Sequence, residues 1–202
     1  AWQKTPKRLK QVSKNLASQL HIPEQTKAWD HEILNVRLDN IISKLDPEHG
    51  GLIGAPKFPN AALLQLLLYQ YQRQPSVMLK QQLQLLLGNL ISKGLKDQVN
   101  GGFYRYSTDS AWLAPHFEKM LYNQALLISV FSKGYQIFKN PAYKEVVLST
   151  FDFINRQLKA PNGYYSAIDA DYRGQEGRYY LFSAQELAQL SSAQRTQFTW
   201  LQ

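Results

Sequence analysis

Residues 101–127 read GGFYRYSTDSAWLAPHFEKMLYNQALL. A pair of glycines opens this stretch, aromatic and charged side chains follow, and an apolar run typical of a helix closes it. Polar groups of complementary chemistry, placed where a loop meets a rigid helix, are typical of binding and catalytic sites. A loop that only connects two helices does not need them. The stretch therefore predicts a candidate functional site just ahead of a helix.

The glycine pair at the start of this stretch has counterparts elsewhere in the chain. Three loops place a Gly-Gly or Asn-Gly pair before Leu, Phe or Tyr: Gly50-Gly51-Leu52, Gly101-Gly102-Phe103 and Asn162-Gly163-Tyr164. The spacings between them are 51 and 61 residues. A repeat of about 50 residues that holds two helices is typical of stacked αα-hairpins. We therefore expect the three loops to lie on one face of the fold.

Apolar spacing predicts helices in most of the remaining chain. The expected helical ranges are 9–20, 24–45, 60–73, 76–93, 115–138, 140–158 and a short stretch from 183. Asn140-Pro141 predicts a cap and first turn, and Ser183 with Glu186 predicts a capping box. Aromatic runs at 163–166 and 178–182 flank a glycine-rich turn and predict a short β-hairpin near 163–182. The predicted fold class is all-α, built from αα-hairpin repeats.

Composition places the chain among globular proteins. Of its 202 residues, 44% are hydrophobic and 19% are charged. No apolar run approaches the ~20 residues that cross a bilayer, so we expect no membrane partner. The absence of cysteine excludes disulfides, thiolate catalysis and cysteine-ligated zinc within this chain. It also favours a reducing compartment, and we predict a cytoplasmic location. Because the sequence begins at Ala1 with neither an initiator Met nor a signal-peptide pattern, it is interpreted as a piece of a longer protein or as one whose start has been removed.

The net charge of +8 is unevenly distributed. Residues 1–27 contain six lysines and arginines against the single acid Glu24. We interpret residues 1–22 as a basic connector helix and residues 23–202 as the main domain. A basic arm can bind nucleic acid, but no nucleic-acid-binding signature accompanies this one, so we expect no such partner.

Three longer motifs permit a comparison with a known family. They are GAPKFP at 54–59, GGFYRYSTD…W…PHFEKMLY at 101–122 and NGYYSAIDADYRGQEGRYYLFS at 162–183. Together, in this order over about 45–185, they resemble the thioredoxin-domain-containing family that includes spermatogenesis-associated protein 20. The resemblance implies an (α/α)6-toroid domain similar to six-hairpin glycosidases and N-acylglucosamine 2-epimerases.

The resemblance also implies a thioredoxin-like domain ahead of the toroid. That domain and its cysteine motif are missing from this sequence, so no redox role is carried over. The chain would supply about half of a toroid, and we expect self-association through the exposed edge. The implied function is binding or processing of a carbohydrate-like small molecule, with glycosidase- or epimerase-like chemistry. The alternative is a non-catalytic platform for the thioredoxin-like domain or another partner.

His116 is the first candidate catalytic residue. It follows Pro115 at the expected start of a helix, where the helix dipole favours a neutral imidazole. A neutral imidazole near pH 7 can act as a general acid or base. Glu118, two helical positions later, would point away from it by roughly 200°. The alternative is a buried histidine that is hydrogen-bonded to the neighbouring loop.

The acidic loop DADYRGQE supplies the other candidates, which are Asp169, Asp171 and Glu176. Glycoside hydrolysis needs two carboxylates facing each other across a sugar, whereas epimerisation needs bases that remove and return a proton. We select Asp169 and Glu176 as catalytic partners of His116. An EF-hand is disfavoured because Arg173 occupies the fifth position and Tyr180 the twelfth, and we expect no metal and no cofactor. The alternative is a network between these carboxylates and Arg173 or Arg178.

Side chains around the second glycine pair are the predicted substrate-binding groups. Arg105 and Asp109 bracket a tight polar loop, and they form either a clamp for substrate or a structural ion pair. Tyr104 and Tyr106 either stack on a sugar ring or simply pack. The predicted binding set is Tyr104, Arg105, Tyr106, Asp109 and Asp171.

Overall fold

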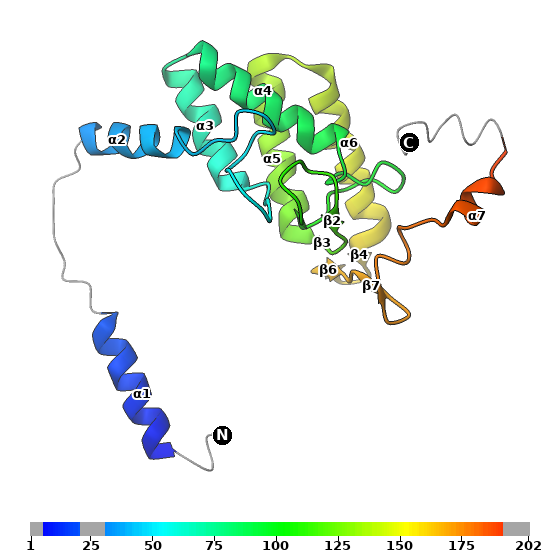
Figure 1. The fold of residues 1–202 in the computed structure, drawn as a ribbon, viewed down its shortest axis with the longest axis horizontal. Coiled ribbons are helices and arrows are strands. Elements are labelled where there is room, and N and C mark those ends of the chain that lie inside the picture. Colours follow the sequence, from blue (N-terminus) through cyan, green and yellow to red (C-terminus); the bar gives the residue numbers. More distant parts are fainter. Residues whose placement is uncertain (1–5, 21–30, 192–202) are drawn as a thin grey trace. The chain divides into compact units, whose positions relative to one another are not determined.

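The structure is a computed structural model that describes residues 6–20 and 31–191, without the side chains of residues 31–34 (Figure 1). The chain divides into two compact units, residues 1–40 and residues 41–202. The predicted domain boundary between residues 22 and 23 lies outside the described residues.

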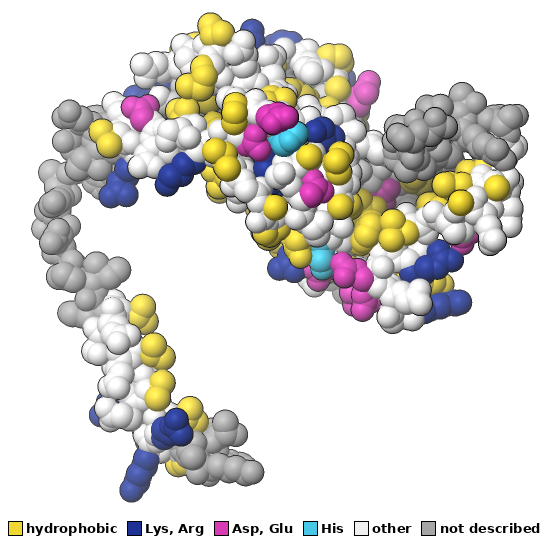
Figure 2. All heavy atoms as spheres, viewed as in Figure 1, with side chains coloured by type: hydrophobic (Ala, Val, Ile, Leu, Met, Phe, Trp, Pro, Cys, Tyr) yellow, Lys and Arg dark blue, Asp and Glu magenta, His cyan; other side chains and the backbone are white. Residues whose placement is uncertain are grey.

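The first unit contains α1 (Pro6–Gln19) and most of α2 (His31–Ile42). None of the residues of α1 is buried. Val12 and Leu16 are exposed on it, and Figure 2 shows hydrophobic side chains along one side of this helix. Among the described residues, no helix combines the length and the apolar character that a membrane crossing requires.

The second unit is built from two αα-hairpins, as the repeat predicted (Figure 1). The first pairs α3 (Ala61–Arg73) with α4 (Val77–Ser92), and the second pairs α5 (Leu121–Phe138) with α6 (Pro141–Phe153). A π-helical turn, η1 (Ile154–Leu158), continues α6. Helix α5 packs against both α6 and α3, so the two hairpins lie side by side.

Local signals set the starts of several helices. The hydroxyl of Ser76 accepts the amide of Leu79 at the start of α4, and the Asn140 side chain caps α6 at the amide of Ala142. Ser183 and Glu186 form the predicted capping box of α7 (Ala184–Ala188). The predicted inner face of α4 is buried, and its residues are Leu79, Leu83, Leu86, Leu87 and Leu90.

The strands are all two residues long and lie in the loops. The pairs are β1 (Tyr106–Ser107) with β2 (Pro115–His116), β3 (Lys119–Met120) with β6 (Ala167–Ile168), β4 (Lys159–Ala160) with β5 (Gly163–Tyr164), and β7 (Asp171–Tyr172) with β8 (Gln175–Glu176). The hairpin β7–β8 turns at Arg173 and Gly174, whose φ angles of 54° and 75° fit a type I′ turn. The prediction of a short hairpin near 163–182 is confirmed, but its strands differ: residues 163–164 pair with 159–160, and residues 178–182 form no strand.

The helix predicted from Pro115 begins only at Leu121. Pro115 and His116 pair with β1 instead, and Lys119 pairs with Ile168 in β6. These two pairings lie on either side of residues 117 and 118. They provide hydrogen-bond partners across the strands for backbone N–H and C=O groups that a helix would otherwise pair. Tertiary pairing thus overrode a proline signal that is local to the sequence.

The loops gather at one end of the hairpins, as expected. A bridge between Lys57 and Ser107 joins the first Gly-Gly loop to the second, and β3–β6 joins the second to the third. The first two loops have equivalent backbones, because bridges close them at Leu45–Leu52 and at Lys96–Phe103. The third differs, since its glycine lies in the tight hairpin β4–β5.

Candidate functional site

A buried ion pair holds the second Gly-Gly loop. One oxygen of Asp97, Oδ1, accepts the backbone amides of Val99 and Asn100 at 2.8 and 2.9 Å. The other oxygen, Oδ2, accepts the Nζ of Lys119 at 2.6 Å, and the same Nζ donates to the Gly101 carbonyl at 2.9 Å. We call this set of contacts the second clamp.

The first Gly-Gly loop contains the same arrangement, which we call the first clamp. Asp46 Oδ1 accepts the amides of Glu48 and His49, both at 2.9 Å. Asp46 Oδ2 accepts from Lys57 Nζ, which also donates to the Gly50 carbonyl at 2.8 Å. Neither pair was among the residues predicted from the motifs. The signal was present, because an aspartate lies four residues ahead of each Gly-Gly pair.

The second clamp is enclosed by protein. The side chains of Asp97 and Lys119 are 4% and 1% exposed. Burial alone would raise the pKa of Asp97, but the charge and hydrogen bond of Lys119 and two backbone amides outweigh it and lower that pKa. Burial lowers the pKa of Lys119, against the attraction of Asp97. The distance of 2.6 Å is that of a charge-assisted hydrogen bond, which fits an ionised pair.

Aromatic rings surround the Lys119 ammonium. Its Nζ lies 4.9 Å from the ring centre of Tyr104, 4.5 Å from Phe153 and 5.2 Å from Tyr180. Burial and the negative charge of Asp97 raise the pKa of Tyr104, and the same causes raise that of Tyr180 to about 12. Both tyrosines are therefore neutral near pH 7, and their rings provide cation–π stabilisation.

A cavity of about 220 Å³ lies beside the second clamp, and Lys119 is part of its wall. Its aromatic lining is Phe153, Tyr172, Tyr179 and Tyr180. Its polar lining includes Asn100, Gln157, Asp169 and Asp171. The predicted catalytic Asp169 and the predicted binding residue Asp171 therefore face the same space. We call this space the tyrosine cavity.

A second, larger cavity of about 440 Å³ shares Asn100, Tyr179 and Tyr180 with the tyrosine cavity. Asp97 and Tyr104 contribute to its lining. Its apolar lining includes Leu113, Pro115, Phe117, Leu181 and Phe182. The second clamp thus lies between two cavities, whereas the sequence indicated one site.

His116 lies in a separate polar cluster. Its ring stacks on Tyr106 at 4.8 Å, and its Nε2 lies 3.4 Å from the carboxylate of Glu176. Its Nδ1 lies 3.6 Å from Glu118 Oε2, without a hydrogen bond, and the same oxygen accepts from Arg105 at 2.6 Å. The prediction that Glu118 points away from His116 on a helix was wrong. Residues 115–118 are not helical, so both side chains reach one cluster.

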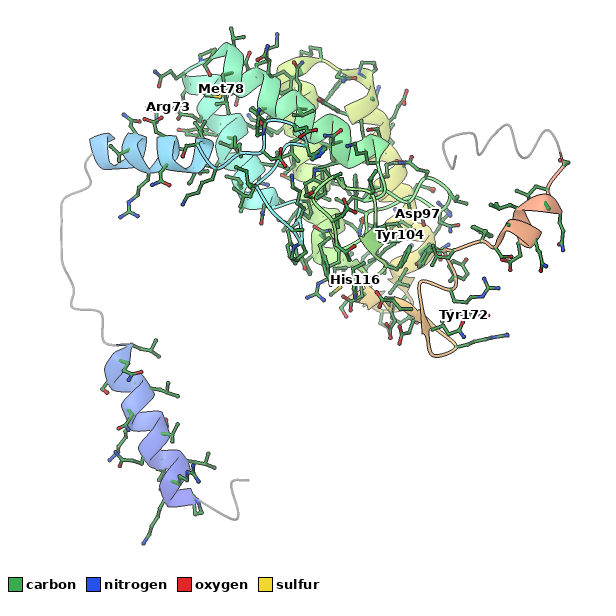
Figure 3. All side chains as sticks on the ribbon, viewed as in Figure 1. Arg73, Met78, Asp97, Tyr104, His116 and Tyr172 are labelled. Atoms are coloured by element: carbon green, nitrogen blue, oxygen red, sulfur yellow. The ribbon has the colours of Figure 1, made fainter. Side chains whose placement is uncertain are left out.

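The predicted catalytic set is therefore divided by the fold. His116 and Glu176 meet, but neither lines the tyrosine cavity or the larger cavity, whereas Asp169 lines the former. Asp169 Oδ1 accepts the amide of Asp171 at 3.1 Å. Strand pairing places Asp171 opposite Glu176, so the hairpin β7–β8 connects the tyrosine cavity with the His116 cluster. Figure 3 labels Asp97, Tyr104, His116 and Tyr172 at the loop end, far from Arg73 and Met78 at the turn between α3 and α4.

The predicted binding residues Arg105 and Asp109 make contacts within the loops. Asp109 does not pair with Arg105, whose partner is Glu118. Its carboxylate accepts backbone amides in its own loop, from Ala111 at 2.6 Å and Ala114 at 2.5 Å among others. Burial would raise the pKa of Asp109, but these amides lower it. Asp109 therefore shapes the loop.

The ring of Tyr104 is 6% exposed and packs edge-on against Phe117 and Tyr180 at 5.3 and 5.2 Å. It therefore forms part of a wall and presents no open stacking face. Tyr106 is also engaged, since its ring contacts Phe58 at 4.8 Å in addition to His116. Both tyrosines pack against other rings within the loops, and their role in binding substrate stays a prediction.

Comparison with known proteins shows which proteins the chain is similar to. No family model matches the chain. Spermatogenesis-associated protein 20 of Mus musculus and that of Homo sapiens are each 38% identical over 156 residues, which is 72% of this chain and 20% of each relative. The chain thus spans about a fifth of the length of the curated relatives it matches.

Two solved structures of similar fold carry the names of sugar epimerases. A sugar epimerase from a ruminal bacterium has a TM-score of 0.60 at 19% identity, covering 68% of this chain and 40% of that one. Cellobiose 2-epimerase from Spirochaeta thermophila DSM 6192 has a TM-score of 0.57 at 20% identity, covering 82% and 41%. At such identities the likeness shows the fold, which is the all-α toroid. Over the matched 156 residues, the chain is similar to spermatogenesis-associated protein 20, and its fold resembles the all-α toroid of the two epimerases.

Proposed function

We propose that this domain binds a carbohydrate-like small molecule in the tyrosine cavity. The observation that carries the proposal is the cavity lining, which combines three tyrosines with two carboxylates and two amide side chains. Ring faces stack on the apolar faces of sugars, and a few polar groups orient the hydroxyls. The volume of about 220 Å³ is below the roughly 300–1,000 Å³ of drug-sized sites, which favours a single sugar ring.

The fold supports the same ligand class. The structures that resemble this chain bear the names of sugar epimerases, and they share the helical-hairpin architecture on which the loops are mounted. Because one fold hosts many functions, this support is an analogy, and the proposal depends on the cavity.

Proton transfer is the chemistry that the His116 cluster favours. An imidazole between two carboxylates, Glu118 and Glu176, has partners that orient it as a general acid or base. Glycoside hydrolysis would instead need two carboxylates that face one ligand. Asp169 and Asp171 both line the tyrosine cavity, so hydrolytic chemistry would use that cavity, whereas epimerase-like chemistry would use the separate cluster of His116 and Glu176.

The alternative function is a non-catalytic platform for a thioredoxin-like domain of the longer protein. One observation favours it. The stack of Phe58, Tyr106 and His116 joins the first loop region to the second, so packing alone accounts for these three rings. In this alternative, His116 stabilises the loop face and transfers no proton.

Ligand-observed NMR with a panel of mono- and disaccharides tests binding. We expect saturation transfer to at least one sugar, and a roughly tenfold weaker affinity for Tyr179→Ala through loss of stacking. The matched control is Tyr69→Ala on α3, because Tyr69 and Tyr179 are 56% and 57% exposed. Absence of any transfer, or an equal affinity of the two variants, would refute the proposed site.

Turnover distinguishes the enzyme from the platform. The chain is incubated with reducing sugars in D2O, and deuterium incorporation next to the carbonyl carbon is followed by NMR. If His116 transfers the proton, His116→Gln stops the exchange and leaves the urea midpoint unchanged. If no sugar exchanges and His116→Gln lowers the midpoint, the platform function is supported.

A further inference from the structure

We infer that the tyrosine cavity selects sugar rings that carry a protonated amine over neutral rings, and neutral rings over phosphorylated or carboxylated ones. This inference rests on the proposed carbohydrate site and names its ligand class. It follows from the charges and ring faces of the lining.

The lining has a net negative charge. The ammonium of Lys119 is neutralised by Asp97 at 2.6 Å, so this pair contributes no net charge. Asp169 and Asp171 remain, and within the described part of the chain neither carboxylate forms an ion pair with a basic side chain. Two uncompensated negative charges therefore face the cavity.

Arg156 and Arg173 are near the cavity but are not among its lining residues. Arg156 donates to Asp152 at 2.6 Å and to the carbonyl of Asn100 at 3.2 Å. Arg173, at the tip of β7–β8, lies 5.2 Å from the ring of Tyr172 and is outside the lining. Figure 2 shows acidic side chains gathered over the region of β6 and β7. An anionic ligand would thus approach carboxylates without a free cation among the lining residues.

The aromatic wall already holds an ammonium group. Tyr179 meets Tyr172 and Tyr180 edge-to-face, with ring centres 5.9 and 5.1 Å apart. The plane of Tyr179 is therefore steeply inclined to the planes of both neighbouring rings. Lys119 Nζ lies 4.5 Å from Phe153 and 5.2 Å from Tyr180, which also line the cavity. Ring faces attract cations, and a carboxylate beside them adds to that attraction. A ligand amine would therefore find both of its preferred partners in one space.

Affinities for four rings of related structure test the inference. Glucosamine, glucose, glucose 6-phosphate and glucuronate are titrated into the chain by NMR at low salt and about pH 6, where the amine is protonated. We expect glucosamine to bind roughly tenfold more tightly than glucose, and the two anions to bind roughly tenfold more weakly than glucose. The differences should shrink as salt is raised, because screening weakens interactions between charges.

Variants assign the effect to the lining. The double variant Asp169→Asn/Asp171→Asn should lose the preference for glucosamine and gain affinity for the anions. Both residues are exposed, so the fold should tolerate the change. The control Glu48→Gln/Glu145→Gln removes the same charge at exposed positions outside the cavity lining, and should keep the parent order.

The outcomes separate this inference from the proposed function. If all four rings bind with equal affinity, or the anions bind best, charge selection is overturned while the carbohydrate site stands. If none of the four binds, both the carbohydrate proposal and this inference fail. If the control variant changes the order as much as the cavity variant does, the selection arises from the overall charge and the inference is wrong.

Discussion

Asp46 and Asp97 hold their loops by the same contacts, yet the two clamps have different surroundings. The carboxylate of Asp46 is 12% exposed and its lysine lies over one ring, that of Trp112, at 5.6 Å. The carboxylate of Asp97 is 4% exposed, and three rings surround Lys119. The second clamp also borders two cavities.

This difference distinguishes the contacts that hold every Gly-Gly loop from the cavity that only the second loop borders. The Asp–Lys clamp occurs in both Gly-Gly loops, and the first clamp borders neither cavity. The clamp therefore has a structural role, which is to hold a Gly-Gly loop. The cavity beside the second clamp depends on the segment from Ile168 to Tyr180, which supplies most of its lining. We therefore expect the clamps to differ in energy and the candidate site to depend on the segment at 168–180.

Removal of each lysine should have the largest effect. Lys119→Met leaves the Asp97 carboxylate buried without its charge partner and should lower the free energy of unfolding by about 3–5 kcal/mol. Lys57→Met should cost about 1–3 kcal/mol, because Asp46 keeps two amide hydrogen bonds and some contact with water. Urea unfolding at neutral pH measures both.

The control is the double variant Asp97→Asn/Lys119→Met, which removes both charges and should recover part of the loss. An equal or larger cost for Lys57→Met would show that the surroundings of the two clamps do not matter.

Replacing the glycines by alanine should destabilise the two loops differently. In the first loop the first glycine should be the more sensitive one, and in the second loop the second glycine. At Gly102 (φ 75°) an added Cβ would lie 2.5 Å from the Phe153 ring, and at Gly50 (φ 72°) it would lie 2.8 Å from the Leu86 backbone. Gly102→Ala and Gly50→Ala should each cost about 2–4 kcal/mol from backbone strain and crowding. The neighbours Gly51 and Gly101 have more room, at 3.1 and 3.4 Å, and alanine there should cost about 1–2 kcal/mol.

Thermal or urea unfolding of the four glycine variants provides the measurement. The same order in both loops would contradict the difference in packing around these glycines.

Acid should weaken the first clamp in a defined window. Burial opposes ionisation of Asp46, but Lys57 and two backbone amides lower its pKa from 3.8 to about 2. Since the folded pKa is the lower one, the contribution of Asp46 is complete above pH 3.8 and is lost as the pH falls towards 2. After allowance for solvent screening it amounts to about 1 kcal/mol.

The stability difference between the parent chain and Asp46→Asn, measured in urea near neutral pH and at low pH, should therefore shrink on acidification. A difference that stays constant or grows would show that the carboxylate charge is not what stabilises this loop.

The surface pair of Arg105 and Glu118 should have the smallest effect. The Arg105 side chain is 41% exposed, and exposed ion pairs contribute little because water and salt screen them. Arg105→Gln should leave the urea midpoint unchanged within error, in contrast to both lysine variants. A loss comparable with that of Lys57→Met would mean that the His116 cluster, and not the clamps alone, stabilises the loop face.

The helices were predictable because their signals are local. The leucine spacing of α4, the Ser76 cap and the capping box at Ser183 each lie within a few residues of the helix they define, and the structure confirms them. The start of α5 was not predictable in this way. Pro115 is typical of a first helical residue, but pairing with β1 competes with the helix and comes from a segment about one loop away.

The structure brings some of the predicted site residues together and separates others. The contact of His116 with Glu176 joins two residues chosen from motif density, although they lie far apart along the chain. The clamps were missed because a lysine far from its aspartate gives no periodic signal, and because Lys119 was placed on a helix. The placement of Asp169 in a different space from His116 depends on how β7–β8 folds back.

The sequence by itself determined the hairpin repeats, their caps and the recurring glycine loops, because these depend on spacing and on backbone preferences within a few residues. Only the tertiary structure decided which acid meets which base. Asp97 and Lys119 belong to one loop region, whereas His116 and Glu176 are separated along the chain by α5 and α6, and no local spacing predicts either contact. The two clamps illustrate both points. The aspartate ahead of each Gly-Gly pair is a local pattern, but the residues that surround it come from the tertiary structure.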